Sequence, residues 1–273
     1  MELDPQIAKH YAQGVERDRL ATWGRLEAAR TTELLKRYLP AAPATVLDVG
    51  GAEGAYALPL AAAGYLMYLV DPVEAHVEAA RVASRRQSSA PLADTAAGDA
   101  RDVSGFDDDS VDAVMMLGPL YHLVDRADRM RALREARRVL RPGGRLMAAA
   151  ISRFASTVDG LRTNAIAESE FESIVVADLE TGVHRNPNVA TRPEWFTLAY
   201  FHRPDELADE VACAGFTGVD VLAIEGPVAL GDDVLSEATT RAAVLRAISR
   251  IEREPALLGA SPHLMAVAEA PPT

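Results

Sequence analysis

The fold follows from one stretch of sequence, Thr45-Val46-Leu47-Asp48-Val49-Gly50-Gly51-Ala52-Glu53-Gly54. Its apolar first half predicts a buried strand, its glycines predict a tight turn, and a helix is expected behind that turn. The next apolar run, residues 66–70, ends in Asp71. A strand, a glycine loop and an acid at the tip of the following strand predict a nucleoside-binding edge on a doubly wound sheet. At such an edge Asp71 can accept hydrogen bonds from both hydroxyls of a ribose.

The glycine spacing separates this loop from other nucleotide-binding loops. A dinucleotide fingerprint requires Gly-x-Gly-x-x-Gly, whereas this loop has Ala52 at its second glycine position and Ala55 at its third. A P-loop requires Gly-Lys-Ser/Thr after the turn, and no such sequence follows here. Asp48, just before the loop, indicates a ligand with an amino group rather than a phosphate. A nicotinamide-dependent oxidoreductase is therefore the weaker interpretation.

The stretch resembles motif I of the class I S-adenosylmethionine (AdoMet)-dependent methyltransferases, Asp/Glu-x-Gly-x-Gly-x-Gly. Asp48, Gly50 and Gly54 match that pattern, and Ala52 replaces its middle glycine. Three later segments resemble further motifs and follow in the family's order. They are residues 97–100 at the third strand, 110–123 at the fourth strand and its active-site loop, and 139–146 at a helix–turn–strand. The chain looks like a small-molecule methyltransferase of the type 11/25-like group.

The resemblance implies a fold and a cofactor. The fold is α/β, with a doubly wound, Rossmann-like, seven-stranded and mostly parallel sheet, an N-terminal helical cap and an inserted lid segment. The cofactor is S-adenosyl-L-methionine, and the product is S-adenosyl-L-homocysteine (AdoHcy). The alternation of apolar runs predicts strands near 45–50, 66–71, 94–98, 111–117 and 145–151, with helices over 54–63, 73–86 and 126–140.

The resemblance also implies where the cofactor binds. Asp71 would bind the ribose, and Asp99 with Ala100 would bind the adenine. The carbonyl of Leu117 would bind the methionine amino group, and Arg30 would reach the methionine carboxylate. Simpler roles stay open, with Asp71 as a turn acid, Asp99 as a cap and Arg30 as a surface side chain. The full set of expected cofactor residues is Tyr11, Arg30, Asp48, Gly50, Gly51, Gly54, Asp71, Pro72, Asp99, Ala100, Leu117 and Gly118.

Tyr121 and His122 are the candidate catalytic residues, because they follow the fourth strand where the transferred methyl group is expected. An unperturbed imidazole titrates near neutral pH, so His122 could act as a general base. The alternative is that it caps the next helix or packs against the loop. Residues 118–121 do not match Asp/Asn-Pro-Pro-Tyr, the motif of amino-directed nucleic-acid methyltransferases. Further candidates for the acceptor pocket, for the base or for a buried aromatic cluster are His184, Trp195, Tyr200 and His202.

No metal site is expected. Asp159, Asn164 and Asp178 occur in the lid, but their spacing carries no metal-ligand signature. Cys213 is the only cysteine, which excludes a disulfide framework. The reaction implied by the resemblance is an in-line displacement at the methyl carbon of a sulfonium. The acceptor would be an O, N or activated C atom of a small molecule, and binding of AdoMet or AdoHcy without transfer is the alternative.

The composition restricts the partners. The 273 residues include 28 basic and 40 acidic side chains, a net charge of −12. A nucleic-acid partner is therefore not expected, because clustered Lys and Arg hold phosphate backbones. The chain shows no signal-peptide pattern and no apolar run long enough to span a membrane, so no membrane contact and a cytoplasmic location are expected. The expected partner is a small-molecule acceptor, an aromatic one included, and the chain is expected to be a monomer or homodimer.

Breaks in the pattern predict the organisation of a single methyltransferase domain over 1–273. No strand pattern stands out in the lid. The C-terminal part shows strands near 219–224 and 263–268, expected as an antiparallel hairpin, and a helix near 234–253. The predicted parts are a helical cap at 1–40, the cofactor-binding core half at 41–153, the inserted lid at 154–202 and the C-terminal part of the core at 203–273.

Overall fold

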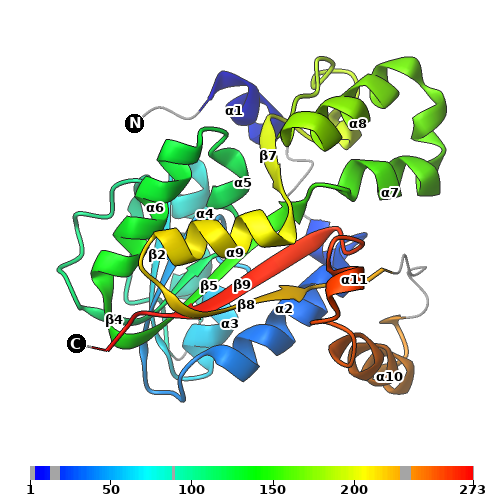
Figure 1. The fold of residues 1–273 in the computed structure, drawn as a ribbon. Helices are drawn as coiled ribbons and strands as arrows, with labels where there is room; N and C mark the ends of the chain where they lie inside the picture. Colours follow the sequence, from blue (N-terminus) through cyan, green and yellow to red (C-terminus); the bar gives the residue numbers. More distant parts are fainter. Residues whose placement is uncertain (1–3, 13–18, 88–89, 228–234, 273) are drawn as a thin grey trace.

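The computed structural model describes residues 4–12, 19–87, 90–227 and 235–272. It is built around a mixed sheet whose parallel strands lie in the order β3-β2-β1-β4-β5 (Figure 1). Each of them falls on an expected strand, although β5 begins before the expected residue 145. Their bounds are Thr45–Val49 for β1, Leu66–Asp71 for β2, Asp94–Ala97 for β3, Val111–Met116 for β4 and Leu140–Ser152 for β5.

Two antiparallel strands extend the sheet beyond β5. β9 (His263–Glu269) pairs with β5, with Met265 opposite Ala149, and β8 (Thr217–Ala223) pairs with β9. These are the strands expected near 219–224 and 263–268. The doubly wound, mostly parallel, Rossmann-like fold is therefore confirmed.

The described part of the chain forms nine strands rather than the seven expected. The two additional strands, β6 (Val183–His184) and β7 (Ala199–His202), come from the lid. β7 pairs with the end of β5 through Ile151 and Phe201, and β6 pairs with β7. Both strands are too short to show a polar and apolar alternation, which is why the sequence pattern did not indicate them.

Helices cover both faces of the sheet, so neighbouring residues of one strand pack in two different cores. Leu47 packs in the core beneath α6 and α9, and Val46 packs in the core beneath α2, α3 and α4. Strands that are covered on both faces read as continuous apolar runs, which made β1 and β4 predictable. The bounds are Arg25–Tyr38 for α2, Ala57–Ala62 for α3, Glu74–Arg86 for α4, Arg126–Val139 for α6 and Pro204–Cys213 for α9.

The lid lies at the end of the molecule where α1 (Pro5–Ala12) is also found (Figure 1). It has a small core of its own, in which Phe171, Ile174 and Val175 surround the buried Trp195. Tyr200 lies at its base, with the Arg129 guanidinium 3.7 Å from the ring centroid. The lid elements are α7 (Ala155–Thr163), η2 (Ala165–Ala167), α8 (Ser169–Thr181), β6, η3 (Pro193–Trp195) and β7.

The N-terminal cap contacts the lid directly. From α1, the Gln6 side chain donates to the Asn186 carbonyl at 2.6 Å, and the Thr197 hydroxyl donates to the Gln6 carbonyl at 3.2 Å. The cap and the lid therefore meet over the sheet. The remaining elements are α1 (Pro5–Ala12), η1 (Arg19–Ala21), α5 (Pro119–His122), α10 (Ala238–Ser249) and α11 (Pro255–Leu258).

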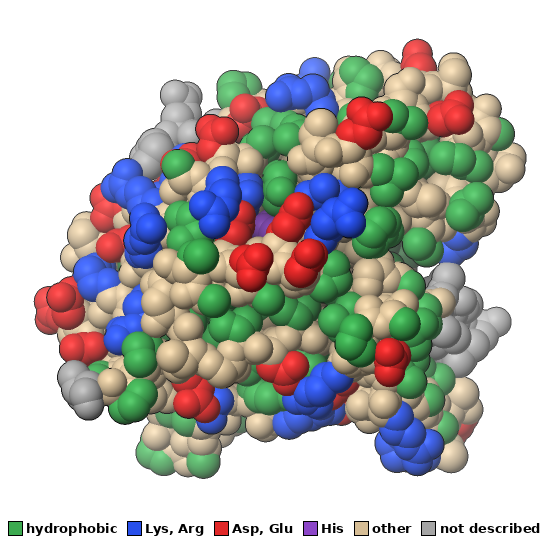
Figure 2. Space-filling view, viewed as in Figure 1, with side chains coloured by type: hydrophobic (Ala, Val, Ile, Leu, Met, Phe, Trp, Pro, Cys, Tyr) green, Lys and Arg blue, Asp and Glu red, His purple; other side chains and the backbone are tan. Residues whose placement is uncertain are grey.

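Basic and acidic side chains lie beside one another on the face shown in Figure 2. Around α9, for example, Arg126 pairs with Glu210 and Arg153 pairs with Glu206. Such mixed charge gives this face no extended positive surface of the kind that holds a phosphate backbone. In the ranges that the structure describes, none of the helices is both long and apolar enough to cross a membrane.

Candidate active site

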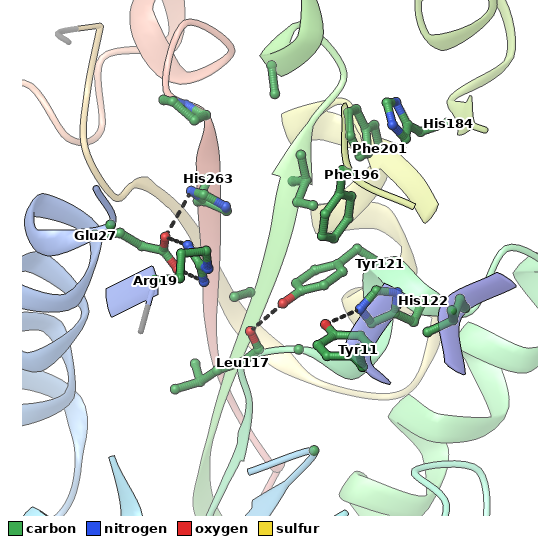
Figure 3. Close-up of a pocket in the computed structure, with 18 of the residues that line it drawn as sticks. Tyr11, Arg19, Glu27, Leu117, Tyr121, His122, His184, Phe196, Phe201 and His263 are labelled. Carbon is green, nitrogen blue, oxygen red and sulfur yellow. Dashed lines mark hydrogen bonds and ion pairs between the residues drawn. The ribbon is translucent and has the colours of Figure 1, made fainter. Parts of the chain in front are cut away.

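A cavity of about 2170 Å³ opens at the carboxyl edge of the sheet. The loops after β1, β2 and β4 line one part of it, and α1 and the lid line another (Figure 3). Pockets for small molecules usually enclose about 300–1,000 Å³. The cavity therefore has room for a cofactor together with a second molecule. It lies where open α/β sheets bind their ligands.

The loop after β1 needs its glycines. Gly50 has φ +73°, and a Cβ there would lie 2.9 Å from Cδ of Pro119. A Cβ on Gly51 would lie 2.7 Å from Oδ2 of Asp48. Ala52, the departure from the family pattern, also takes a positive φ of 47°, and its N–H donates to Oδ2 of Asp71 at 2.9 Å. This hydrogen bond stabilises the loop despite a backbone conformation that alanine rarely adopts.

Asp71 ends β2, and three donors orient its carboxylate. Besides the Ala52 N–H, the Val73 N–H donates to Oδ1 at 2.9 Å, and Nδ1 of His76 lies 3.2 Å from the same oxygen. Because a carboxylate has about four acceptor positions, it retains capacity for a ligand. Asp71 and Pro72 both line the cavity.

Asp48 is a buried carboxyl group at the cavity wall, with 2% of its surface exposed. Burial raises the pKa of Asp48 to about 7, and the negative charge of Asp71 adds to the rise. Among the described residues, no donor forms a hydrogen bond with this carboxyl group. A cationic ligand would favour its ionised form, so the site is suited to an ammonium group.

Asp99 and Ala100 follow β3 and line the cavity, and Asp99 is held by a neighbour. Nε and Nη2 of Arg101 donate to the two Asp99 oxygens at 2.9 and 2.6 Å, and Nη1 donates to Asp128 at 2.6 Å. Burial acts to raise the pKa of Asp99, but the hydrogen bonds from Arg101 outweigh it and keep this pKa below its usual value. Arg101 also lines the cavity and was not predicted.

The candidate catalytic residues lie on α5, at the base of the cavity. The Tyr121 hydroxyl donates to the Leu117 carbonyl at 3.4 Å. The Tyr11 hydroxyl, from α1, lies 2.7 Å from Nε2 of His122, and Nδ1 of His122 lies 3.5 Å from the Leu198 carbonyl. A carbonyl oxygen only accepts, so we assign the proton to Nδ1, and Nε2 then accepts from Tyr11.

Aromatic rings surround the His122 imidazole. The ring centroids of Tyr11, Tyr121 and Phe196 lie 5.4, 4.7 and 5.8 Å from that of His122. We call these four residues the aromatic wall. It combines α1, α5 and the lid, while Leu117 and Gly118 line the cavity beside it (Figure 3).

Two of the expected cofactor residues do not belong to the described cavity lining. Gly54 is directed to the following helix, where a Cβ on it would lie 3.1 Å from Cγ of Leu58. Arg30 is fully buried, and it donates to the Ile224 carbonyl at 2.9 Å and to Glu252 at 2.6 Å. The expectation that Arg30 reaches a cofactor carboxylate is therefore wrong, because its charge is used to neutralise the buried Glu252.

The two lid histidines are engaged inside the protein. Nδ1 of His184 lies 2.9 Å from Oδ2 of Asp178, and Nε2 lies 2.8 Å from the Trp195 carbonyl, so neither nitrogen is left for a substrate. His202 is fully buried, with Nε2 3.4 Å from Glu210, and it does not belong to the described cavity lining. His122 also has partners at both ring nitrogens, but its Nε2 meets a hydroxyl, which can exchange a proton, whereas His184 meets a carboxylate and a carbonyl. Of the three candidate bases, His122 is therefore the one whose surroundings suit the role.

A second group of side chains that line the cavity was not predicted. Arg19, Glu27, Glu225 and His263 line the cavity across from the aromatic wall, and we call them the charged wall (Figure 3). Arg19 donates to both oxygens of Glu27, and Nδ1 of His263 lies 2.6 Å from Glu225. Burial acts to lower the pKa of His263, but Glu27 and Glu225 raise it to about 9. The signal was available, since Glu225 follows one predicted strand and His263 begins another.

The charged wall also brings possible metal-binding atoms together. One oxygen each of Glu27 and Glu225 and Nδ1 of His263 lie within 4.8 Å of one another. A divalent ion there would have to displace the Arg19 guanidinium and the proton that His263 shares with Glu225. The group is therefore better described as two ion pairs than as a metal centre.

Comparisons with known proteins agree with the sequence motifs and the fold. Residues 47–148 match a family model described as a methyltransferase domain. An uncharacterized methyltransferase of Mycobacterium tuberculosis is 40% identical over 114 residues, and one of Mycobacterium bovis matches to the same extent. The match covers 42% of this chain and 42% of the curated relative, so the chain spans less than half of that protein's length.

Solved structures share the fold over most of the chain. A SAM-dependent methyltransferase of Thermotoga maritima has a TM-score of 0.60 at 20% identity, covering 97% of this chain and 98% of its own. One of Methanosarcina mazei has a TM-score of 0.59 at 19% identity, covering 88% of this chain and 98% of its own. The motif, the fold and the family match agree: residues 47–148 match a methyltransferase domain, the chain shares the fold of SAM-dependent methyltransferases, and AdoMet is the cofactor that such a domain implies.

Proposed function

We propose that this chain transfers the methyl group of AdoMet to an O, N or activated C atom of a small molecule bound in the cavity. One observation carries the proposal. The strand-end carboxylates Asp48 and Asp71 and the pair formed by Tyr11 and His122 line the same continuous space. Cofactor and acceptor can therefore meet inside the protein, where alignment of the reacting atoms can lower a barrier by roughly 7–11 kcal/mol.

The loops after β1, β2 and β3, which we call the cofactor side of the cavity, fit AdoMet. Asp71 retains acceptor capacity for ribose hydroxyls, and Asp48 offers a buried carboxyl group for the methionine ammonium. Gly50 and Gly51 let the loop pack closely on Pro119 and on the Asp48 carboxyl group, because a Cβ at either position would clash there. Asp99 would face the adenine amino group. When bound, AdoMet supplies a methyl group already activated by a sulfonium.

We assign His122 the role of general base for acceptors that carry a proton. Nε2 is the basic nitrogen of the assigned tautomer, and the Tyr11 hydroxyl orients it. Because Nε2 accepts from the Tyr11 hydroxyl, the acceptor's proton would pass to the Tyr11 oxygen as the hydroxyl's own proton moves to Nε2. The Leu198 carbonyl accepts from Nδ1–H and would stabilise the imidazolium that forms. Base assistance of this kind typically contributes 10²–10⁴-fold. Tyr121, held by the Leu117 carbonyl, would limit the space beside the acceptor.

Incubation with methyl-labelled AdoMet and a panel of phenols, amines and indoles tests the proposal. The expected result is a labelled product formed together with an equal amount of AdoHcy. His122→Ala should slow this product formation by about 10²–10⁴-fold while the protein still binds AdoMet. Failure of the wild-type protein to label any member of a broad panel would argue against transfer.

Binding of AdoMet without transfer is the second candidate function. One solved structure with this fold, at TM-score 0.56 and 18% identity, is a [4+2]-cyclase, so the fold does not determine the reaction. Ala52, with its positive φ, also departs from the motif at the methionine end. Tight AdoMet binding with no AdoHcy formed from any acceptor would favour this function.

A further inference from the structure

The charged wall contains polar groups that the proposed reaction does not use. Its residues come from distant segments: Arg19 from η1, Glu27 from α2, Glu225 from the loop after β8 and His263 from the first residue of β9. All four nevertheless line the same cavity as the aromatic wall. Charged side chains at a cavity wall are costly to desolvate, so their convergence points to a binding role.

Both carboxylates of the charged wall already have cationic partners. Glu27 accepts from two nitrogens of Arg19, one of them at 2.9 Å. Glu225 accepts from the Ser261 hydroxyl at 3.2 Å, from the His263 backbone N–H at 3.2 Å and from Nδ1 of His263 at 2.6 Å. The acidic groups are therefore satisfied, and they hold Arg19 and His263 in place.

His263 keeps one ring nitrogen for a ligand. Nδ1 is turned toward Glu27 and Glu225, which leaves Nε2 on the other side of the ring (Figure 3). Within the described residues Nε2 has no hydrogen-bond partner, and it is not one of the buried unpartnered atoms. The side chain is 21% exposed and lines the cavity. A protonated ring whose Nδ1–H is donated to Glu225 presents Nε2–H as a donor.

We propose that Nε2–H of His263 binds a carboxylate of the methyl acceptor, so that the acceptor spans the cavity between the charged wall and the aromatic wall. This inference rests on the proposed function, because it requires an acceptor in the cavity. Charge-assisted hydrogen bonds are about twice as strong as neutral ones, which favours a carboxylate over an amide or ketone. The substrate class is then an aromatic carboxylic acid with its nucleophilic atom at the end away from the acid.

A cationic ligand matches the charged wall less well. An ammonium group or a divalent ion would meet the fixed charges of Arg19 and His263, while Glu27 and Glu225 are already paired. Among the described residues, the charged groups that face the imidazole are Arg19 from η1, Glu27 from α2 and Glu225 from the loop after β8. Because the two glutamates raise the pKa of His263 to about 9, the ring keeps its proton near neutral pH.

Calorimetric titration of the AdoHcy-loaded protein tests the inference. The probes are matched pairs, hydroxybenzoates against hydroxybenzamides and indole carboxylates against indole carboxamides. Near neutral pH, at least one acid should bind roughly tenfold or more tightly than its amide. In His263→Gln, which retains a polar side chain but no charge, this preference should fall to less than about threefold.

AdoHcy binding is measured first in each protein. If the wild type does not bind AdoHcy, the proposed function fails and this inference fails with it. If AdoHcy binds but acids and amides bind equally, or no acid binds, the inference alone is overturned. A loss of AdoHcy affinity in His263→Gln would also overturn the inference, because the charged wall would then bind the cofactor rather than the acceptor. So would acid binding that requires Mn²⁺ or Zn²⁺ and is lost with a chelator.

Glu225→Gln provides a second, conservative variant. Its amide keeps the shape of the side chain but removes the negative charge beside Nδ1 of His263. In the wild type, the preference for acids should disappear as the pH rises through about 9, because the imidazolium loses its proton there. In the variant the preference should disappear at a lower pH. An unchanged pH limit, in a variant with an unchanged melting temperature, would contradict the inference.

Discussion

The two sides of the cavity are built in different ways. On the cofactor side, Asp48, Asp71 and Asp99 each lie at or next to the end of a parallel strand. On the acceptor side, the aromatic wall and the charged wall join the N-terminal cap, α5, the lid and the C-terminal strands. The parallel strands of the sheet position the residues of the cofactor side. The residues of the acceptor side are positioned by the packing of segments that lie far apart in the sequence. Cofactor identity can therefore be recognised from short motifs, whereas the acceptor cannot.

This difference makes the two sides separable by mutation. Variants of the strand-end carboxylates should change AdoMet affinity and leave the base in place. Variants of the aromatic wall should change turnover and leave AdoMet affinity unchanged. A variant that changes AdoMet affinity and turnover by similar factors would show that the two sides are not separable.

His122→Ala should have the largest effect. We expect kcat with an active acceptor to fall by about 10²–10⁴-fold, because the variant removes the general base. The dissociation constant of AdoMet should stay within about twofold of the wild-type value. Single-turnover kinetics and calorimetry measure the two quantities separately. If AdoMet affinity fell as much as kcat, we would conclude that His122 binds the cofactor and does not act as the base.

Arg30→Met should destabilise the protein without touching either side of the cavity. The variant leaves Glu252, which is 1% exposed, without its buried partner. Breaking a buried ion pair costs about 3–5 kcal/mol when the remaining charge has no other partner. Glu252 keeps Arg37 and Arg253 at its other oxygen. We therefore expect a smaller loss, about 1–3 kcal/mol, measurable as a lower free energy of unfolding in urea. Glu252→Gln in the same chain should recover part of the loss. If Arg30→Met instead weakened AdoMet binding at unchanged stability, the rejected cofactor role would be restored.

Asp71→Ala should weaken AdoMet binding by roughly tenfold or more, because hydrogen bonds to a charged group in a buried site are lost. The variant also removes the acceptor that holds the Ala52 N–H. Asp71→Asn, which keeps one acceptor oxygen, should show a smaller loss. Calorimetry measures AdoMet affinity in both variants. Unchanged affinity in the alanine variant would contradict the proposal that Asp71 binds the ribose hydroxyls.

Asp48 should make cofactor binding depend on pH, with a smaller effect. Its pKa is raised to about 7, so the carboxyl group is neutral below that pH and ionised above it. AdoMet affinity should therefore increase as the pH rises from 6 to 8, by roughly threefold to tenfold. In Asp48→Asn this dependence should be absent. A flat profile in the wild type would show that Asp48 does not face the ammonium group.

Most of the sheet could be predicted from the sequence. β1, β2 and β4 are covered on both faces, and their apolar runs are bounded by Gly or Asp, so position and length are both visible. The lid could not be predicted in the same way. β6 and β7 owe their existence to pairing with each other and with β5, and such short strands carry no periodic signal of their own.

The same contrast, between residues at strand ends and residues whose position depends on distant segments, holds for the candidate site. Asp48, Asp71 and Leu117 line the cavity, and this could be predicted because each stands next to a strand end that the sequence reveals. Arg30 was assigned to the cofactor because a helical pattern does not identify the partner, which here is Glu252, 222 positions away along the chain. His263 was overlooked for the same reason, since its role depends on its approach to Glu225.

Calorimetric titration of the wild-type protein with AdoMet, AdoHcy and NAD tests the central claim most directly. We predict binding of both sulfur compounds in the micromolar range and no binding of NAD, because the loop after β1 lacks the third glycine of a dinucleotide site. Binding of NAD alone, or of none of the three, would contradict the claim that this cavity is a methyltransferase site.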